Sequence, residues 1–199
     1  MNHDTLSPYT AFAGSRHVAS GDLRHVALKA HESLDKGEQA PLVILDNATC
    51  RLVEVDLRGT ADDVVKRLPA PSDAQAEPEP EDTPRGPGRP KLGVVAREVT
   101  LLPRHWEWLN GQPGGASVAL RKLVEDARRS HQAKDRQREG RDVLYRFMSM
   151  LAGDQPGFEE ASRALFAGDK AGFSKHIASW PQDLRHHAEM LSGAAFEDA

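Results

Sequence analysis

The sequence predicts an α+β protein built from a small mixed N-terminal unit, a linker and a mostly helical C-terminal half. Short β-branched runs alternate with one amphipathic helix pattern before residue 58. A stretch rich in proline and acidic residues follows, and apolar residues then recur at helical spacing. We therefore expect four segments: a small α+β domain at 1–68, a flexible linker at 69–92, a strand–helix–helix segment at 93–131 and a helical bundle at 132–199.

The N-terminal segment is expected to follow the order β-β-α-β-β-α. The expected elements are strands at 9–13 and 16–19, a helix at 21–36 that Ser20 caps, strands at 41–46 and 51–57, and a last helix opened by a Thr60–Asp63 capping box. In the fourth strand, Leu52 and Glu54 alternate with Val53 and Val55, a pattern typical of a half-buried antiparallel strand.

No group of residues in this segment has the spacing of a catalytic or metal site, and we expect neither a metal nor a cofactor. Its aspartates fall at strand ends or in the first turn of a helix, where the helix dipole favours them. His17 and the other histidines are scattered, which favours solvent exposure or ordinary packing. Cys50 is the only cysteine, so no internal disulfide is expected, and a reducing cytoplasm fits.

The linker is the clearest predicted boundary. Residues 69–84 are rich in proline and acids and contain no aromatic or β-branched aliphatic residue, so the segment cannot offset the entropy of ordering. A basic arm follows, Arg85-Gly-Pro-Gly-Arg89-Pro-Lys91, and its Gly-Arg-Pro core resembles an AT-hook. The resemblance implies an arm that places Arg89 in the narrow minor groove of A·T tracts. The alternative is a plain extension of the linker.

The segment after the arm combines a strand pattern and two helix patterns. We expect a strand at 94–102, a helix that begins at Pro103, a break at 111–115 and a second helix capped by Ser117. We also expect Trp106 to be buried against Leu120 and Val124 of the second helix.

This order of elements resembles the ribbon–helix–helix fold of bacterial repressors. The resemblance implies a dimer whose paired strands read the major groove through Arg97, Val99 and Leu101. Two of those three positions are apolar here. Two alternatives therefore stay open: a shifted strand register that uses Arg97 and Thr100, or a helix–turn–helix whose second helix reads the DNA.

The C-terminal half is expected to form a compact helical bundle. Ser130–Gly140 is expected to be a continuing or frayed helix. Apolar residues at helical spacing predict helices over 142–152, from Pro156, after Asp169 and from Pro181. Breaks at Gly153, Gly168 and Trp180-Pro181 separate these helices, whose aromatic and Met stripe we interpret as core.

Charge is distributed unevenly along the chain. Residues 85–146 hold 14 Lys/Arg and 7 Asp/Glu, a net charge of +7, whereas the whole chain carries −4. A basic middle in an acidic protein indicates a polyanionic partner. We therefore expect a non-enzymatic protein that binds double-stranded DNA, as a transcriptional regulator or nucleoid-associated factor, and forms a homodimer. The expected DNA-binding residues are Arg85, Arg89, Lys91, Arg97, Thr100, Arg104, Arg121, Lys122 and Arg128.

Two other functions stay open from the sequence. One is a protein-interaction or scaffold module whose basic middle meets an acidic protein. The other is an enzyme acting through the N-terminal unit, which would need a pocket with a perturbed carboxylate or histidine.

The block from Gly88 to Ser117 also resembles an uncharacterised bacterial family, a domain of unknown function. The resemblance extends over most of the chain, including FMSMLAGDQPGFEEASRALFAGD near the C-terminus. It implies a bacterial cytoplasmic protein and brings no activity. No apolar run reaches the 18 or so residues that span a bilayer, and the N-terminus lacks the apolar region of a signal peptide.

Overall fold

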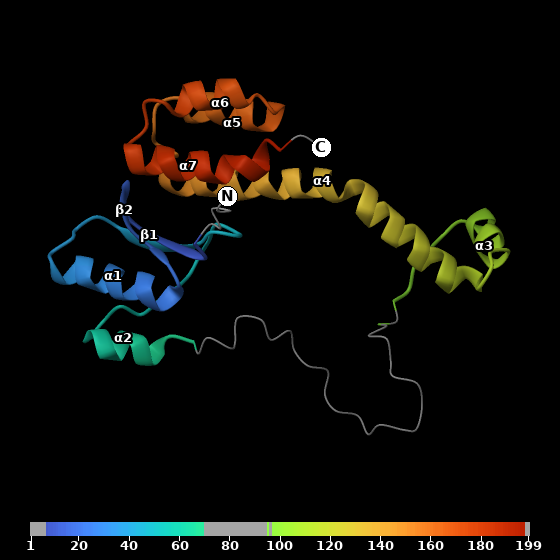
Figure 1. The fold of residues 1–199 in the computed structure, drawn as a ribbon, viewed down its shortest axis with the longest axis horizontal. Helices are drawn as coiled ribbons and strands as arrows, with labels where there is room; N and C mark the ends of the chain where they lie inside the picture. Colours follow the sequence, from blue (N-terminus) through green and yellow to red (C-terminus); the bar gives the residue numbers. More distant parts are fainter. Residues whose placement is uncertain (1–6, 70–94, 96, 198–199) are drawn as a thin grey trace, which may run out of the picture. The chain divides into compact units, whose positions relative to one another are not determined.

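The computed structural model describes residues 7–69, 95 and 97–197 (Figure 1). The described residues form an α+β structure with a four-stranded antiparallel sheet. The elements in chain order are β1 (Tyr9–Ala13), β2 (Arg16–Gly21), α1 (Leu23–Asp35), β3 (Leu42–Asp46), β4 (Arg51–Leu52), α2 (Ala61–Arg67), α3 (Pro103–Asn110), α4 (Gly115–Leu151), α5 (Phe158–Ala167), α6 (Lys170–Ile177) and α7 (Gln182–Ala195). The predicted fold class is confirmed.

Several local predictions match the structure because short-range chemistry decides them. The Thr60 side chain accepts from the backbone of Asp63 while the Asp63 carboxylate accepts from that of Thr60, which completes the predicted capping box of α2. Pro103 begins α3. Asp169 caps α6 by accepting from the backbone of Gly172 at 2.8 Å.

Two predictions in the N-terminal segment are wrong. Asp22, and not Ser20, caps α1, because its carboxylate accepts from the backbone of His25 at 2.8 Å. Ser20 stays in β2 as its penultimate residue. The expected strand at 51–57 shortens to Arg51–Leu52, which pair with β3, and one further backbone hydrogen bond joins Val53 N to Ile44 O at 2.8 Å.

The sheet buries both of its faces. Alternate residues of a strand point to opposite faces, and β1 sends Phe12 to one core and Ala11 to another. In β3, Leu45 joins the core of Phe12, and Ile44 joins that of Ala11. The sheet order β2-β1-β3-β4 places β1 and β3 in the centre, which is where residues buried on both faces are expected.

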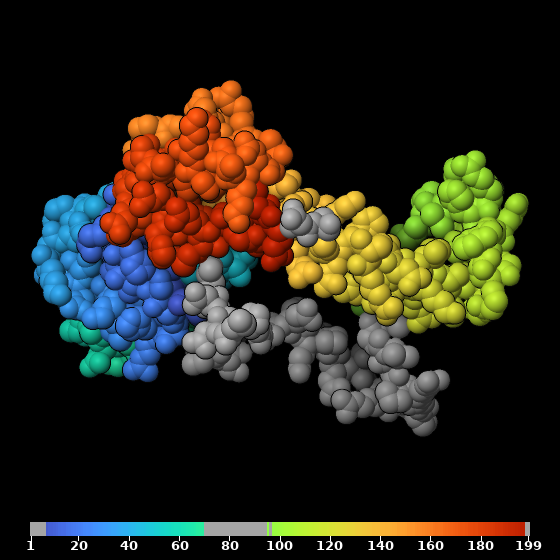
Figure 2. All heavy atoms as spheres, turned by 45° about the horizontal axis from the view of Figure 1, so that its top comes forward, coloured from blue at the N-terminus to red at the C-terminus, as the bar shows by residue number. Residues whose placement is uncertain are grey.

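The two faces are covered by different parts of the chain. Val26 and Ala30 of α1 pack on Ala11 and Ile44. On the other face, Phe12 and Leu45 share a core with the C-terminal helices, including Phe147 of α4 and Leu184 of α7. Figure 2 shows the N-terminal residues in blue touching the C-terminal residues in red.

The described residues therefore divide into two compact units in a way that differs from the four predicted segments. The first unit combines Met1–Pro69 with Ala133–Ala199, and the second is Ala70–Gln132. The sequence pattern predicts separate domains at 1–68 and 132–199. The structure packs them together, because the apolar face of the sheet that carries Phe12 needs a partner layer and the C-terminal helices supply it.

The C-terminal helices follow the predicted breaks, with one longer helix. The predicted helix from Ser117 and the pattern at 142–152 belong to one continuous helix, α4, which begins at Gly115. Ser117 therefore lies inside its first turn and is not its cap. Within the first unit, Gly140 of α4 lies so close to α7 that an added Cβ would stand 2.7 Å from the backbone of Ala194.

Candidate nucleic-acid interface

The second unit is described from Arg97 to Gln132, with Val95, and holds α3, a glycine turn and the first half of α4. Gly111 ends α3, and its backbone N–H donates to Glu107 O. Gly114 and Gly115 then adopt φ values of +87° and +74°, which favour glycine over other residues. This Gln112–Gly115 turn lets α4 start directly after α3, as the glycine cluster in the sequence predicts.

The strand expected at 94–102 is absent from its described residues. Val95 and residues 97–102 have no strand partner in the described part of the chain, and Val95 and Val99 are exposed. A strand is stabilised by hydrogen bonds to a neighbouring strand, and none is present here. The strand prediction is therefore wrong for the single chain.

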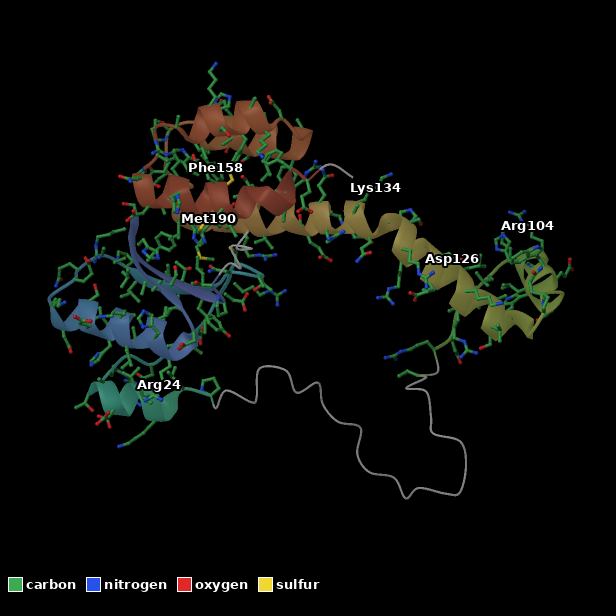
Figure 3. The ribbon with its side chains drawn as sticks, in the orientation of Figure 1. Arg24, Arg104, Asp126, Lys134, Phe158 and Met190 are labelled. Carbon is green, nitrogen blue, oxygen red and sulfur yellow. The ribbon has the colours of Figure 1, made fainter. Side chains whose placement is uncertain are left out.

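The structure places six of the nine predicted DNA-binding residues, and all six are exposed. Arg97 and Thr100 lie in the segment before α3, Arg104 lies on α3, and Arg121, Lys122 and Arg128 lie on α4. Figure 3 shows Arg104 on α3 and Asp126 on α4. The other three, Arg85, Arg89 and Lys91, lie outside the described residues.

The acids of α4 engage some of these cations and leave others available. Glu125 pairs with Arg128 at 3.4 Å and with Arg129 at 3.7 Å. Arg121 donates to the carbonyl of Ser117 at 3.1 Å, so its charge is not neutralised. Among the described residues, Arg97, Arg104 and Lys122 form no ion pair within 4.0 Å.

The cations of α4 repeat at a spacing that aligns them along the helix. Arg121 and Arg128 are seven residues apart, as are Lys122 and Arg129, and seven residues make almost two turns. Each pair therefore lies on one side of α4, with the two sides adjacent. Such a double row can follow the phosphates of a nucleic acid backbone.

The same unit buries few of its apolar residues. Among its described residues only Leu109 and Ala119 are buried. Trp106 is 37% exposed and Val124 is 57% exposed, so the prediction that Trp106 is buried against Leu120 and Val124 is wrong. Trp108 and Leu123 are also exposed. Among the described residues of this unit, α3 and α4 have no third layer packed on them, and two helices alone cannot enclose these side chains.

The sequence predicts the exposed cations of this unit but not its exposed apolar side chains. The spacing of Trp106 and Trp108 could have predicted this exposure, because the two side chains lie about 200° apart around a helix. A single neighbouring helix cannot bury both of them. In the described residues, no three His, Cys, Asp or Glu side chains are placed to hold a metal ion. No described helix is long and apolar enough to cross a membrane.

The comparison with protein families identifies the chain. One family model, described as an uncharacterized protein conserved in bacteria, matches residues 8–192. The chain belongs to the family DUF2239. The match covers residues of both compact units of this DUF2239 protein, including the candidate interface residues from Arg97 to Arg128. Searches of curated proteins and of solved structures found no match to this DUF2239 chain.

Proposed function

We propose that this DUF2239 protein binds double-stranded DNA through its second unit, as a homodimer with a regulatory or nucleoid-associated role. No reaction is assigned to that unit. The observation that carries the proposal is the double row of cations on α4, Arg121 with Arg128 and Lys122 with Arg129, together with the exposed Arg104 on the preceding helix α3. Lys and Arg side chains in such a row bind phosphates and release condensed counterions.

The uncovered apolar side chains support the homodimer. Trp106, Trp108, Leu123 and Val124 leave a large apolar area in water on a unit with only two buried apolar residues among those described. Burying such area contributes roughly 25 cal/mol per Å². A second copy of the chain brings the same side chains, so an isologous contact covers both sets at once.

The basic arm adds a second contact to the proposal. Arg85, Arg89 and Lys91 precede the described part of the second unit by only a few residues. An arm of this composition fits a minor groove next to the site of the helices. Phosphate contacts of the helices would then supply affinity, and Arg89 would supply the preference for A·T pairs.

The test is a titration of fluorescent 30-base-pair duplex with the full chain at 50 and at 200 mM salt. About six phosphate contacts should weaken binding roughly a thousandfold between these salt concentrations. The double variant Arg121→Ala/Arg128→Ala should weaken binding. It should also reduce the slope of log affinity against log salt concentration by the equivalent of about two phosphate contacts. The matched control is Arg24→Ala/Lys66→Ala, which removes two exposed charges of the first unit. Equal effects of both double variants, or no duplex binding at 50 mM salt, would overturn the proposal.

The second candidate is a scaffold module, and the exposed tryptophans favour it. Trp residues are enriched at the centres of protein interfaces. In that case Trp108→Ala would abolish the capture of an acidic partner protein while the chain shows no salt-dependent binding to duplex. The duplex titration therefore separates the two functions.

A further inference from the structure

Four polar side chains of the first unit form a continuous hydrogen-bonded chain that the proposed function does not use. Asn47 Nδ2 donates to Thr10 Oγ1 at 2.8 Å. Thr10 Oγ1 is 2.9 Å from Ser20 Oγ, and Ser20 Oγ is 2.7 Å from His17 Nε2. Thr10 and Asn47 are buried, Ser20 is partly buried and His17 is exposed. This hydrogen-bonded chain of side chains therefore leads from the buried Asn47 to the exposed His17.

A β-bulge in β2 brings His17 and Ser20 together. Residues three apart in a regular strand point to opposite faces of the sheet. Here the pairing shifts between Ala11 and Phe12, so that Ala11 pairs with Ala19 while Phe12 pairs with His17, and Val18 is the extra residue. The bulge turns His17 to the face on which Ser20 lies opposite Thr10. Bulges that re-aim one side chain are frequent beside functional sites.

The directions of the hydrogen bonds follow from elimination. The carbonyl of Ser7 can only accept, and it lies 2.6 Å from Asn47 Nδ2, which fixes the orientation of the amide. Thr10 therefore accepts from Asn47, and Ser20 is the one remaining described partner for its buried hydroxyl proton. A buried donor without a partner costs about 1–3 kcal/mol, so Thr10 donates to Ser20. Ser20 then donates its own proton to His17 Nε2.

His17 has the protonation state that a base requires. Burial of part of the ring lowers its pKa, an effect that the carboxylate of Asp183 partly offsets and His186 reinforces. The Asp183 carboxylate also accepts from the backbone N–H of His17 at 2.8 Å and anchors the base to α7. His187, on the same helix, is the third titratable group near His17. At neutral pH the ring is therefore uncharged, with Nε2 free to take a proton.

We propose that Ser20 is a nucleophile activated by His17 as general base, and that the pair transfers acyl groups from small activated esters. Ser20 Oγ attacks the carbonyl carbon and forms a new C–O bond while its proton moves to His17 Nε2. The bond to the leaving alcohol then breaks, and His17 gives its proton to that alcohol, or to solvent where the alcohol leaves as its anion. Water then attacks the acyl-serine while His17 takes the water proton, and the acid leaves as Ser20 regains a proton. Thr10 and Asn47 are positioning residues that hold Ser20 in its rotamer.

The class of substrate follows from the surroundings of the pair. His17 lies at the surface, and neither His17 nor Ser20 lines the two hollows described in the first unit, one beside Glu32 and one beside Val53. Neither hollow encloses an acyl group beside the partly buried Ser20, so a small ester is the substrate that fits this setting. An activated ester has a good leaving group, so its departing alcohol needs little stabilisation by the protein. This compensates for the lack of an enclosing pocket around Ser20.

The test uses the full chain and p-nitrophenyl acetate, with acetylated peptides mapped by mass spectrometry. Trypsin cleavage after Arg16 and Arg24 yields residues 17–24, HVASGDLR, in which Ser20 is the one hydroxyl side chain. We expect acetyl on Ser20 in the unaltered protein, and fragment ions distinguish it from acetyl on His17. The rate should rise with pH as His17 loses its proton. General base catalysis typically contributes about 100-fold or more, so His17→Asn should slow the acetylation of Ser20 at least about tenfold.

Two controls make the outcome decisive. Ser15→Ala removes an exposed serine of the turn before β2 and should leave the rate unchanged. Thr10→Val removes the proton donor to Ser20 and should change the pH profile of acetylation, which a purely structural role would not do. Acetylation confined to lysines and the N-terminus would overturn the proposal, as would equal acetylation of Ser20 in the unaltered protein and in His17→Asn. Duplex binding is measured separately, so failure of either proposal leaves the other intact.

Discussion

The ring of His187 on α7 meets the ring of Phe12 on β1 edge-on, with the two ring centroids 5.3 Å apart. Phe147 of α4 completes the group, with its centroid 4.7 Å from that of His187 and 5.8 Å from that of Phe12. Aromatic pairs in this geometry contribute about 0.5–1.5 kcal/mol beyond the burial of their area. The three rings join the N-terminal sheet to the C-terminal helices of the first unit.

Phe12→Ala should destabilise both parts of this unit together. Phe12 is fully buried, and truncation of a buried Phe costs about 3–5 kcal/mol. Denaturant unfolding followed by circular dichroism should show a lower midpoint with a single transition. Phe166→Ala is the control, because Phe166 is exposed and its loss should change the unfolding free energy by less than about 1 kcal/mol. A small effect of Phe12→Ala would contradict the shared core.

His187 should make the first unit sensitive to mild acid. Burial lowers its pKa from 6.5 to about 4, with smaller contributions from His17 and His186. The folded state therefore binds fewer protons than the unfolded state between these values, and stability falls as pH drops from about 6.5 to 4. The largest loss from this residue is about 3 kcal/mol. His17, whose pKa is also lowered, adds a loss of the same sign.

The measurement is the unfolding free energy from pH 7 to pH 4 for the unaltered chain and for His187→Gln. The variant should be less stable at pH 7 and should lose less stability on acidification. His25→Gln changes an exposed histidine of α1 and serves as the control. Parallel pH curves for the unaltered chain and His187→Gln would show that the buried imidazole does not cause the acid sensitivity.

Gly140→Ala should destabilise the first unit because α4 and α7 approach each other there. The added methyl would lie 2.7 Å from two backbone atoms of α7, at Ala194 and Ala195. Backbone atoms cannot rotate away as a flexible side chain can. The overpacking should therefore lower the free energy of unfolding by about 1–3 kcal/mol or more. Gly193→Ala on α7 meets nothing within 4 Å and should instead stabilise by about 0.5–1 kcal/mol, since alanine favours a helix. Thermal unfolding of the two variants should therefore shift in opposite directions.

Arg89→Ala tests the predicted minor-groove arm. If Arg89 lies in an A·T groove, its loss should weaken binding to A·T-rich duplex by about 1–3 kcal/mol and affect G·C-rich duplex less. Arg85→Ala or Lys91→Ala should weaken both duplexes equally, because phosphate contacts carry no sequence information. These losses of affinity are measured by titrating each variant on both duplexes at one salt concentration. Equal losses for all three variants would reduce the arm to a non-specific tether.

The elements fixed by neighbouring residues could be predicted from the sequence. The capping box of Thr60 and Asp63, the proline that begins α3 and the aspartate that caps α6 each depend on atoms within three residues of one another. The exposure of Arg121 and Arg128 also follows from helical spacing in a polar stretch. Such interactions are local, so the sequence contains all the partners.

The misassigned cap of α1 shows where local chemistry gives two answers. Ser20 and Asp22 are both good caps, and the sequence does not decide between them. The pairing of β2 with β1 decides, because Ser20 is held opposite Thr10 in the sheet. Asp22 is then the first residue free to cap α1. The hydrogen-bonded chain from Asn47 to His17 depends on this outcome.

The sequence by itself determined the α+β class, most helix ends and the basic middle, since each depends on composition or on neighbours along the chain. Only the tertiary structure decided that the sheet and the C-terminal helices share one core, that His187 packs against both Phe12 and Phe147, and that Ser20 meets His17. These relationships join residues as much as 175 positions apart, such as Phe12 and His187. Periodicity predicts that each of these surfaces must be covered, but the partner is set by the packing of the whole chain.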